Sequence, residues 1–169
     1  MRKRSAPKHP ERVGLAITGA SGSIYGLRVL EELLRVRGLE VHLTISAAAA
    51  QVLRLEHGLR VDLDRFDARA LKVTGAARAV YHHHADVAAP PASGSFRLRA
   101  LAIVPCSMGC AGKLAHGISG DLIERAADVM IKERRTLVIV PRETPLSAIH
   151  LDNLARLAHL GVTVLPAAP

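Results

Sequence analysis

The sequence predicts a three-layer α/β domain built on a doubly wound parallel sheet. The chain has 169 residues, of which 49% are hydrophobic, enough for one domain with a sizeable core. Short runs of Val, Ile, Leu and Ala are apolar at consecutive positions, as expected of strands that are covered on both faces. Segments of about 10 to 15 residues with helical periodicity separate these runs, and this alternation is typical of a parallel sheet with helices on both sides.

The pattern predicts five strands and four helices. The predicted strands are 12–18, 39–46, 98–107, 136–143 and the short segment 162–166. The predicted helices are 25–38, 47–58, 118–135 and 147–161. Glycines at 38, 58 and 161 mark three helix ends, and Asp121 stands near the start of the third helix. Residues 59–97 show no clear period, and the APPASGS segment within them has the composition of a loop.

The net charge of +8 is concentrated at the N-terminus. Residues 1–12 hold five basic residues against Glu11, a net of +4, and we expect a flexible basic tail there, ahead of a domain at 13–169. The remaining +4 is spread over the rest of the chain, so nucleic-acid binding is not expected. No apolar run is long enough to span a bilayer and no signal peptide is recognisable, which predicts a cytoplasmic protein without membrane contact.

Four segments follow predicted strands and should meet at one edge of the sheet, where doubly wound proteins bind ligands. They are TGASGS, SAAA, PCSMG and PRETP. The glycines at 19, 22 and 26 fit neither the dinucleotide fingerprint nor the phosphate-binding loop. Ser21 and Ser23 beside a helix start favour an anion, although a plain turn with a serine cap explains them equally well. Ser107, with the backbone of Met108 and Gly109, can contact a ring or a phosphate.

Charged residues near the same edge allow two interpretations each. Arg142 suits a phosphate or carboxylate, or forms a surface ion pair with Glu143. Arg125 and Lys132 share one helical face. Glu124, Asp128 and Lys132 also repeat every four residues, as on an ordinary solvated face.

No metal site or disulfide is expected. The three histidines at 82–84 are consecutive, and no helical pair of ligands accompanies them. Cys106 and Cys110 are too few for a zinc site, and the predicted compartment is reducing.

Several motifs together resemble the UbiX-type flavin prenyltransferases, within the homo-oligomeric flavin-containing cysteine decarboxylase-like proteins. These motifs are ITGASGSIYGLRVLEEL, APPASGS, VPCSMG, DLIERAADVMIKERRTLVIVPRETPLSAIHLDNL and GVTVLPAAP. The likeness runs from about Val13 to Pro169. It implies a Rossmann-like flavoprotein that binds FMN and transfers a dimethylallyl group from dimethylallyl monophosphate to N5 and C6 of the reduced cofactor, without a metal.

The resemblance also implies the site residues. The positions matching FMN contacts are Gly19, Ala20, Ser21, Ser46, Ser107, Met108, Gly109, Cys110 and Arg142. The positions matching the donor-phosphate site are Arg125, Lys132 and Glu143. Glu56, Glu143 and Ser21 are the implied catalytic residues, and Glu56 matches an acid assigned to proton handling. Glu143, Glu56 or the released phosphate can accept the proton lost from C6.

The resemblance further implies a trimer-based dodecamer whose product passes to a decarboxylase that uses prenylated FMN. Val87 and Ala88 stand where relatives often have an aromatic residue, which affects the expected shape of the prenyl pocket. Relatives continue beyond the position of Pro169 with residues that contact the donor phosphate. We therefore expect the 169-residue chain to bind FMN but to turn over slowly.

Three other functions remain open from the sequence. An FMN-dependent decarboxylase of cysteine-type substrates needs a histidine near the flavin, for which His116 and His150 are candidates. A non-catalytic subunit that only binds FMN needs the cofactor site alone. A nucleic-acid module would depend on the basic residues at 1–12.

Overall fold

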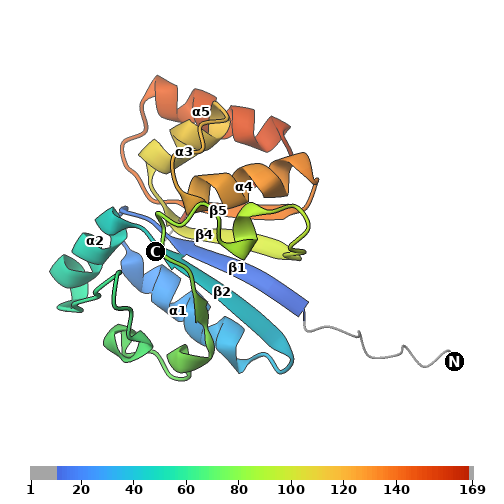
Figure 1. The fold of residues 1–169 in the computed structure, drawn as a ribbon. Helices are drawn as coiled ribbons and strands as arrows, with labels where there is room; N and C mark the ends of the chain where they lie inside the picture. Colours follow the sequence, from blue (N-terminus) through green and yellow to red (C-terminus); the bar gives the residue numbers. More distant parts are fainter. Residues whose placement is uncertain (1–10, 168–169) are drawn as a thin grey trace, which may run out of the picture.

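A six-stranded parallel sheet with helices on both faces forms the protein, which confirms the predicted fold class (Figure 1). The computed structural model describes residues 11–167. The strands are β1 (Glu11–Ile17), β2 (Leu39–Ile45), β3 (Val80–Tyr81), β4 (Ala100–Cys106), β5 (Thr136–Pro141) and β6 (Thr163–Val164). Their order in the sheet is β3-β2-β1-β4-β5-β6. The chain therefore builds the sheet outward in one direction from β1 and in the other from β4.

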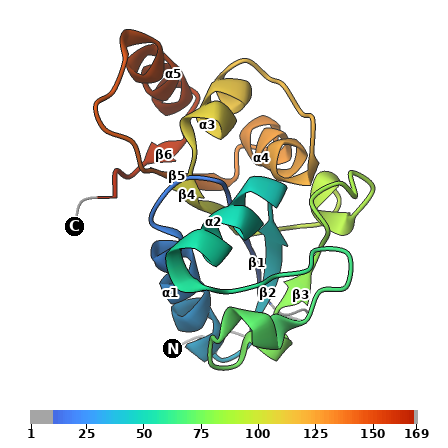
Figure 2. The ribbon, with the colours of Figure 1, turned by 90° about the vertical axis from the view of Figure 1, so that its left-hand side faces the viewer.

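The helices form two layers around the sheet. They are α1 (Ser23–Arg35), α2 (Ala47–His57), α3 (Met108–Ala115), α4 (Leu122–Lys132) and α5 (Ala148–His159). Helices α3, α4 and α5 lie together on one side of the sheet, and α1 lies on the other (Figures 1 and 2). Short 3₁₀ helices occupy Ala68–Leu71, Ala76–Arg78 and Pro90–Ala92.

The core is divided by the sheet into two apolar clusters. Successive residues of β1 face opposite ways, so that Leu15 and Ile17 pack under α1 whereas Ala16 packs under the α3–α5 layer. Gly26 lets α1 approach the sheet closely, because a Cβ there would overlap the Val104 carbonyl and crowd Ile17. Tight packing in this layer fixes the start of α1 relative to the carboxyl ends of β1 and β4.

One α-helix and one strand were not predicted, nor were the 3₁₀ helices. No helix was predicted directly after β4, but residues 108–115 form helix α3 with Ser107 as its N-cap. The short strand β3 lies inside the segment for which no period was visible. Asp121 caps α4 as expected, its side chain accepting a hydrogen bond from the Glu124 N–H at 2.9 Å.

The predicted N-terminal boundary is two residues too late. Glu11 and Arg12 belong to β1 and pair with Leu39 and Glu40 of β2. The Arg12 guanidinium also lies 3.0 Å from the Glu40 carboxylate. The rest of the predicted basic tail, residues 1–10, lies outside the described residues. Within 11–167, no helix has the length and apolar character needed to cross a membrane.

Candidate functional site

The turns that follow β1, β2 and β4 are joined at the carboxyl edge of the sheet. The Thr18 hydroxyl donates to the Pro105 carbonyl at 2.8 Å and accepts from the Ser107 N–H at the same distance. The Ser46 N–H donates to the Ile17 carbonyl at 3.0 Å. Segments that are far apart in sequence therefore form one continuous surface, as the strand-end rule predicts.

A cavity of about 240 Å³ opens on this surface. Its lining residues are Thr18, Gly19, Ser46, Ala48, Ser107, Gly109, Cys110, Lys113, Asp121, Ile123 and Glu124. Five of the residues predicted to contact the cofactor, Gly19, Ser46, Ser107, Gly109 and Cys110, are thus in one cavity. Ala20 and Met108, two further predicted contacts, are buried and adjoin lining residues in the sequence. Ser21 is exposed and does not line the cavity.

Two helix starts border the cavity. Ser46 and Ser107 cap α2 and α3, and their hydroxyls accept hydrogen bonds from the Ala49 and Cys110 N–H groups at 3.1 and 3.2 Å. Each hydroxyl keeps its proton for a ligand, and the positive ends of both helix dipoles favour a ligand oxygen that carries negative charge. A Cβ built at Gly109 would meet no atom within 4 Å, so the first turn of α3 is open. These donors and this open surface fit a flavin nucleotide.

A half-buried ion pair in the cavity lining was missed by the sequence analysis. The Glu124 carboxylate, only 4% exposed, accepts hydrogen bonds from Lys113 Nζ at 2.7 Å and from the Gly120 N–H at 2.6 Å. The hydrogen bond and the charge of Glu124 raise the pKa of Lys113. The interpretation that Glu124 belongs to a solvated face is therefore wrong, because α3 covers this side of α4.

The start of α1 is occupied by a carboxylate of the same chain. Helix α1 begins at Ser23, and its N-cap is Gly22 in a left-handed conformation with φ 86°. Glu56, near the end of α2, accepts hydrogen bonds from the Gly22 N–H, the Ser23 N–H and the Ser23 hydroxyl at 2.9, 2.9 and 2.6 Å. The sequence analysis allowed a serine N-cap or a bound anion beside Ser21 at this helix start. The N-cap is Gly22 instead, and the negative charge at the helix start is the Glu56 carboxylate.

These hydrogen bonds keep Glu56 ionised. Burial acts to raise the pKa of the Glu56 carboxyl, but the Ser23 hydroxyl and the two N–H groups outweigh it, so the pKa is lowered from its ordinary value. Nε2 of His57 lies 3.5 Å from Oε2 of Glu56. That nitrogen is buried and has no hydrogen-bond partner among the described residues.

Arg142 and Glu143 follow β5 at the same edge of the sheet. Cγ of Arg142 lies 3.7 Å from the position that a Cβ at Gly22 would take, so Arg142 reaches the turn after β1. Arg142 is half-buried, whereas Glu143 is exposed and accepts a hydrogen bond from the Thr144 N–H at 3.1 Å.

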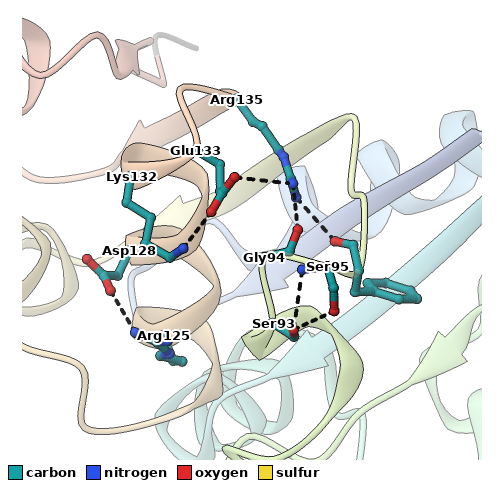
Figure 3. Close-up of polar contacts among 9 residues, drawn as sticks. Ser93, Gly94, Ser95, Arg125, Asp128, Lys132, Glu133 and Arg135 are labelled. Carbon is teal, nitrogen blue, oxygen red and sulfur yellow. Dashed lines mark hydrogen bonds and ion pairs between the residues drawn. The ribbon is translucent and has the colours of Figure 1, made fainter.

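A second polar group lies where the end of α4 meets the loop at Ser93, Gly94 and Ser95, hereafter the Gly94 loop (Figure 3). Lys132 Nζ is 2.5 Å from the Glu133 carboxylate. Arg135 donates to the carbonyls of Gly94 and Phe96 at 2.6 and 3.2 Å and so ties the loop to the end of α4. Arg125 pairs with Asp128 one turn apart at 2.9 Å. The structure thus brings Lys132 to the APPASGS segment.

The three histidines at 82–84 are used within the fold. Nε2 of His82 lies 2.8 Å from Nδ1 of His42, and burial lowers the pKa of both rings. The rings of His83 and His84 stack on one another. In the part of the chain that the structure describes, no group of three or more His, Cys, Asp or Glu is placed to hold a metal ion.

The two cysteines are free and buried. The hydrogen bond with Cys110 and then burial hold the pKa of the Cys106 thiol well above its usual value. A thiol in this state is a poor nucleophile.

A doubly wound parallel sheet with a cavity where its strand order reverses defines a nucleotide-binding α/β protein. The sequence model of the family described as Flavoprotein matches residues 1–169. The flavin prenyltransferase UbiX of Halalkalibacterium halodurans is 48% identical over 155 residues, which cover 92% of this chain and 75% of that protein. The chain belongs to the flavoprotein family, among the UbiX flavin prenyltransferases.

Two solved structures extend the comparison. The complex of AnUbiX with FMN and dimethylallyl pyrophosphate superposes with a TM-score of 0.83 at 39% identity, covering 95% of this chain and 80% of that one. The dodecameric FMN-dependent UbiX-like decarboxylase of Escherichia coli O157:H7 gives a TM-score of 0.82 at 38% identity, covering 94% and 80%.

Proposed function

We propose that this protein is a flavin prenyltransferase. It joins a dimethylallyl group from dimethylallyl monophosphate to N5 and C6 of reduced FMN, and the prenylated FMN serves a partner decarboxylase. The observation that carries the proposal is the pair of cations Lys132 and Arg135 at the Gly94 loop, hereafter the cationic group. Its residues do not line the cavity between α2 and α3. Any flavoprotein needs a cofactor cavity, whereas a second site for a phosphate leaving group is needed by a prenyl transfer.

The cavity residues hold the cofactor in this proposal. Gly19, Ala20, Ser46, Ser107, Met108, Gly109 and Cys110 contact FMN through backbone groups and hydroxyls. Arg142 adds a charged donor from the end of β5, and Ser21 keeps only an outer position. When bound, reduced FMN supplies the electron-rich N5 and C6 that accept the dimethylallyl carbons.

Lys132 and Arg125 stabilise the leaving phosphate. Breaking the allylic C–O bond develops negative charge on the phosphate oxygens, and fixed cations lower the energy of that charge separation. The proton lost from C6 then needs an acceptor. Glu56 is held ionised by three hydrogen bonds and is therefore a weak base. We propose that it stabilises the start of α1 and does not accept the proton from C6. Glu143, exposed and with a single hydrogen bond from Thr144, is the proposed acceptor together with the phosphate.

We also propose that the protein acts as a homo-oligomer, a trimer-based dodecamer, in the cytoplasm. Large apolar side chains are exposed around the start of α5, among them Leu146, Ile149 and Leu151 at 41%, 71% and 53%. Apolar patches of this kind mark association surfaces. The dodecameric relative supports the same assembly.

The decarboxylase of cysteine-type substrates is less well supported. Nδ1 of His116 lies 2.8 Å from the Gly112 carbonyl at the end of α3. Nδ1 of His150 accepts a hydrogen bond from the Ser147 N–H in the capping box of α5. Both candidate histidines therefore have structural partners at helix ends.

The test is a prenyl-transfer assay. Purified protein is incubated with reduced FMN and either dimethylallyl monophosphate or the diphosphate, without metal, and the flavin is analysed by mass spectrometry. We expect FMN carrying one five-carbon unit. Lys132→Ala should reduce its formation. FMN retained without turnover would support a non-catalytic flavin subunit, and oxidative decarboxylation of a cysteine-containing peptide would support the decarboxylase.

A further inference from the structure

The Glu133 carboxylate lies inside the cationic group at the Gly94 loop. Its Oε1 is 2.5 Å from Lys132 Nζ, and its Oε2 is 3.7 Å from Nη2 of Arg135 (Figure 3). The Lys132 hydrogen bond holds the pKa of the Glu133 carboxyl below its ordinary value, so this group is an anion at neutral pH. One carboxylate therefore lies between two cations and neutralises only part of their charge, and one of these cations is proposed to bind the donor phosphate.

Lys132 and Glu133 lie at the end of α4. Lys132 is the last helical residue and Glu133 is its C-cap. Arg134 then adopts a left-handed conformation with φ 52°, which turns the chain sharply before β5. Lys132 and Glu133 both precede this turn, and their side chains meet beside Gly94.

The Gly94 loop forms the floor beneath this carboxylate. A Cβ at Gly94 would lie 2.7 Å from Oε1 of Glu133 and 3.2 Å from Nζ of Lys132, so both side chains lie close against the backbone of this glycine. Arg135 fixes the loop through the Gly94 carbonyl. Two cations and a glycine backbone thus lie beside a partly exposed carboxylate, and the same surroundings suit a phosphate, which also binds through negatively charged oxygens.

We propose that Glu133 is the resident anion of the donor-phosphate site, a role that rests on the function proposed above. Glu133 neutralises Lys132 while the donor is absent, yields Lys132 to the phosphate when the donor binds, and then remains with Arg135. A ligand must therefore compete with an internal carboxylate. A phosphate monoester carries about 1.5 to 2 negative charges at pH 7 and competes well, whereas singly charged anions compete poorly. Glu133 in this way lowers the affinity of the site for every anion, and a strongly charged ligand such as a phosphate monoester is needed to displace it.

Glu133→Gln tests the proposal through binding alone. Inorganic phosphate and acetate are the probes, titrated calorimetrically into wild-type protein and variant. Because both partners are partly exposed, we expect the variant to bind phosphate about 2- to 5-fold more tightly. Acetate should gain no more than phosphate, because its single charge is repelled less by Glu133. The matched control is Glu32→Gln, which removes an equally short ion pair with Arg35 on α1 and should change neither affinity.

A double-mutant cycle separates this role from a general change in surface charge. In a Lys132→Ala background, Glu133→Gln should no longer tighten phosphate binding, because the cation for which Glu133 competes is gone. Unchanged or weaker phosphate binding in Glu133→Gln, or an equal gain without Lys132, would overturn the proposal.

Prenyl transfer distinguishes this inference from the function on which it rests. If wild-type protein transfers the dimethylallyl group but Glu133→Gln leaves the donor KM and the phosphate affinity unchanged, the resident-anion role fails and the function stands. If the phosphate gain depends on Lys132 but no prenyl transfer occurs, the anion site stands and the proposed reaction fails.

Discussion

Three hydrogen bonds hold the Glu56 carboxylate at the start of α1, and they link the last turn of α2 to the turn that follows β1. The contact joins two residues more than 30 positions apart. A side-chain acid thus satisfies N–H groups that a neighbouring serine would cap in most helices. Glu56 therefore belongs to the framework of the site.

Glu56→Gln should lower stability in a pH-dependent way. We expect a loss of about 1–2 kcal/mol in the free energy of unfolding at pH 7, because the charge is lost from three hydrogen bonds and a helix start. The folded-state pKa is lowered from an ordinary 4.5, so the contribution is complete above that pH and disappears as the pH falls through the folded-state value. Urea unfolding of wild type and variant between pH 7 and pH 3 checks this, with Glu32→Gln as the control. A gap that stays constant down to pH 3 contradicts it.

Arg142 and Lys132 should affect different ligands. Arg142 lies beside Gly22 at the edge of the sheet, whereas Lys132 lies beside Gly94. Arg142→Ala should weaken FMN binding and Lys132→Ala should weaken donor binding, each by roughly 10- to 100-fold for a lost charged donor. Separate titrations with FMN and dimethylallyl monophosphate measure both. Equal effects of the two variants on both ligands would refute the division.

Among the elements, those with a strong period were predicted and those without were missed. The leucines of α1 and the glycine that follows α2 identify their helices in any tertiary context. Helix α3 has only eight residues, two of them glycines, and its burial comes from packing on α4 and α5. Glu124 was misassigned for the same reason, because its partner Lys113 belongs to the helix that was not predicted.

Two glycine-to-alanine changes in helices should have opposite effects. Gly26→Ala places a methyl group against the Val104 carbonyl, and we expect it to cost about 1–3 kcal/mol of stability through overpacking. Gly109→Ala meets open space within α3 and should leave the free protein as stable or slightly more so, by up to ~1 kcal/mol. Thermal unfolding compares them.

The same Gly109→Ala variant reports on the cofactor site. Its methyl group enters the cavity wall at the first turn of α3, so FMN affinity should fall although stability does not. Fluorescence titration of FMN measures this. Unchanged affinity would remove Gly109 from the proposed contacts.

For the whole molecule, the strand-end rule predicted that the turns after β1, β2 and β4 meet, and these turns line one cavity. The rule could not identify Glu56 as the partner of α1 or Glu133 as the partner of Lys132. Both depend on side chains that meet only after the helices pack. The polar residues after strands carry a sequence signal, whereas contacts between helix ends depend on lengths and angles that no local pattern records.

The exposed apolar residues of α5 predict that copies of the protein associate through this helix. Ile149→Glu places a charge on a side chain that is 71% exposed in the single chain, and should shift the protein to smaller species if α5 is covered by another copy. Val36→Glu, at a site 51% exposed after α1, is the matched control. Sedimentation velocity measures both variants. An identical distribution for wild type and Ile149→Glu argues against an interface at α5.

The Thr18 hydroxyl, just after β1, joins the two halves of the sheet. It donates to Pro105 at the end of β4 and accepts from Ser107 at the start of α3. The loops on either side of the cavity therefore cannot separate without breaking both bonds. Their conformational entropy is lost when the chain folds rather than when a ligand arrives. A cofactor therefore binds to loops that are already ordered, and the entropy cost of ordering them does not weaken its binding.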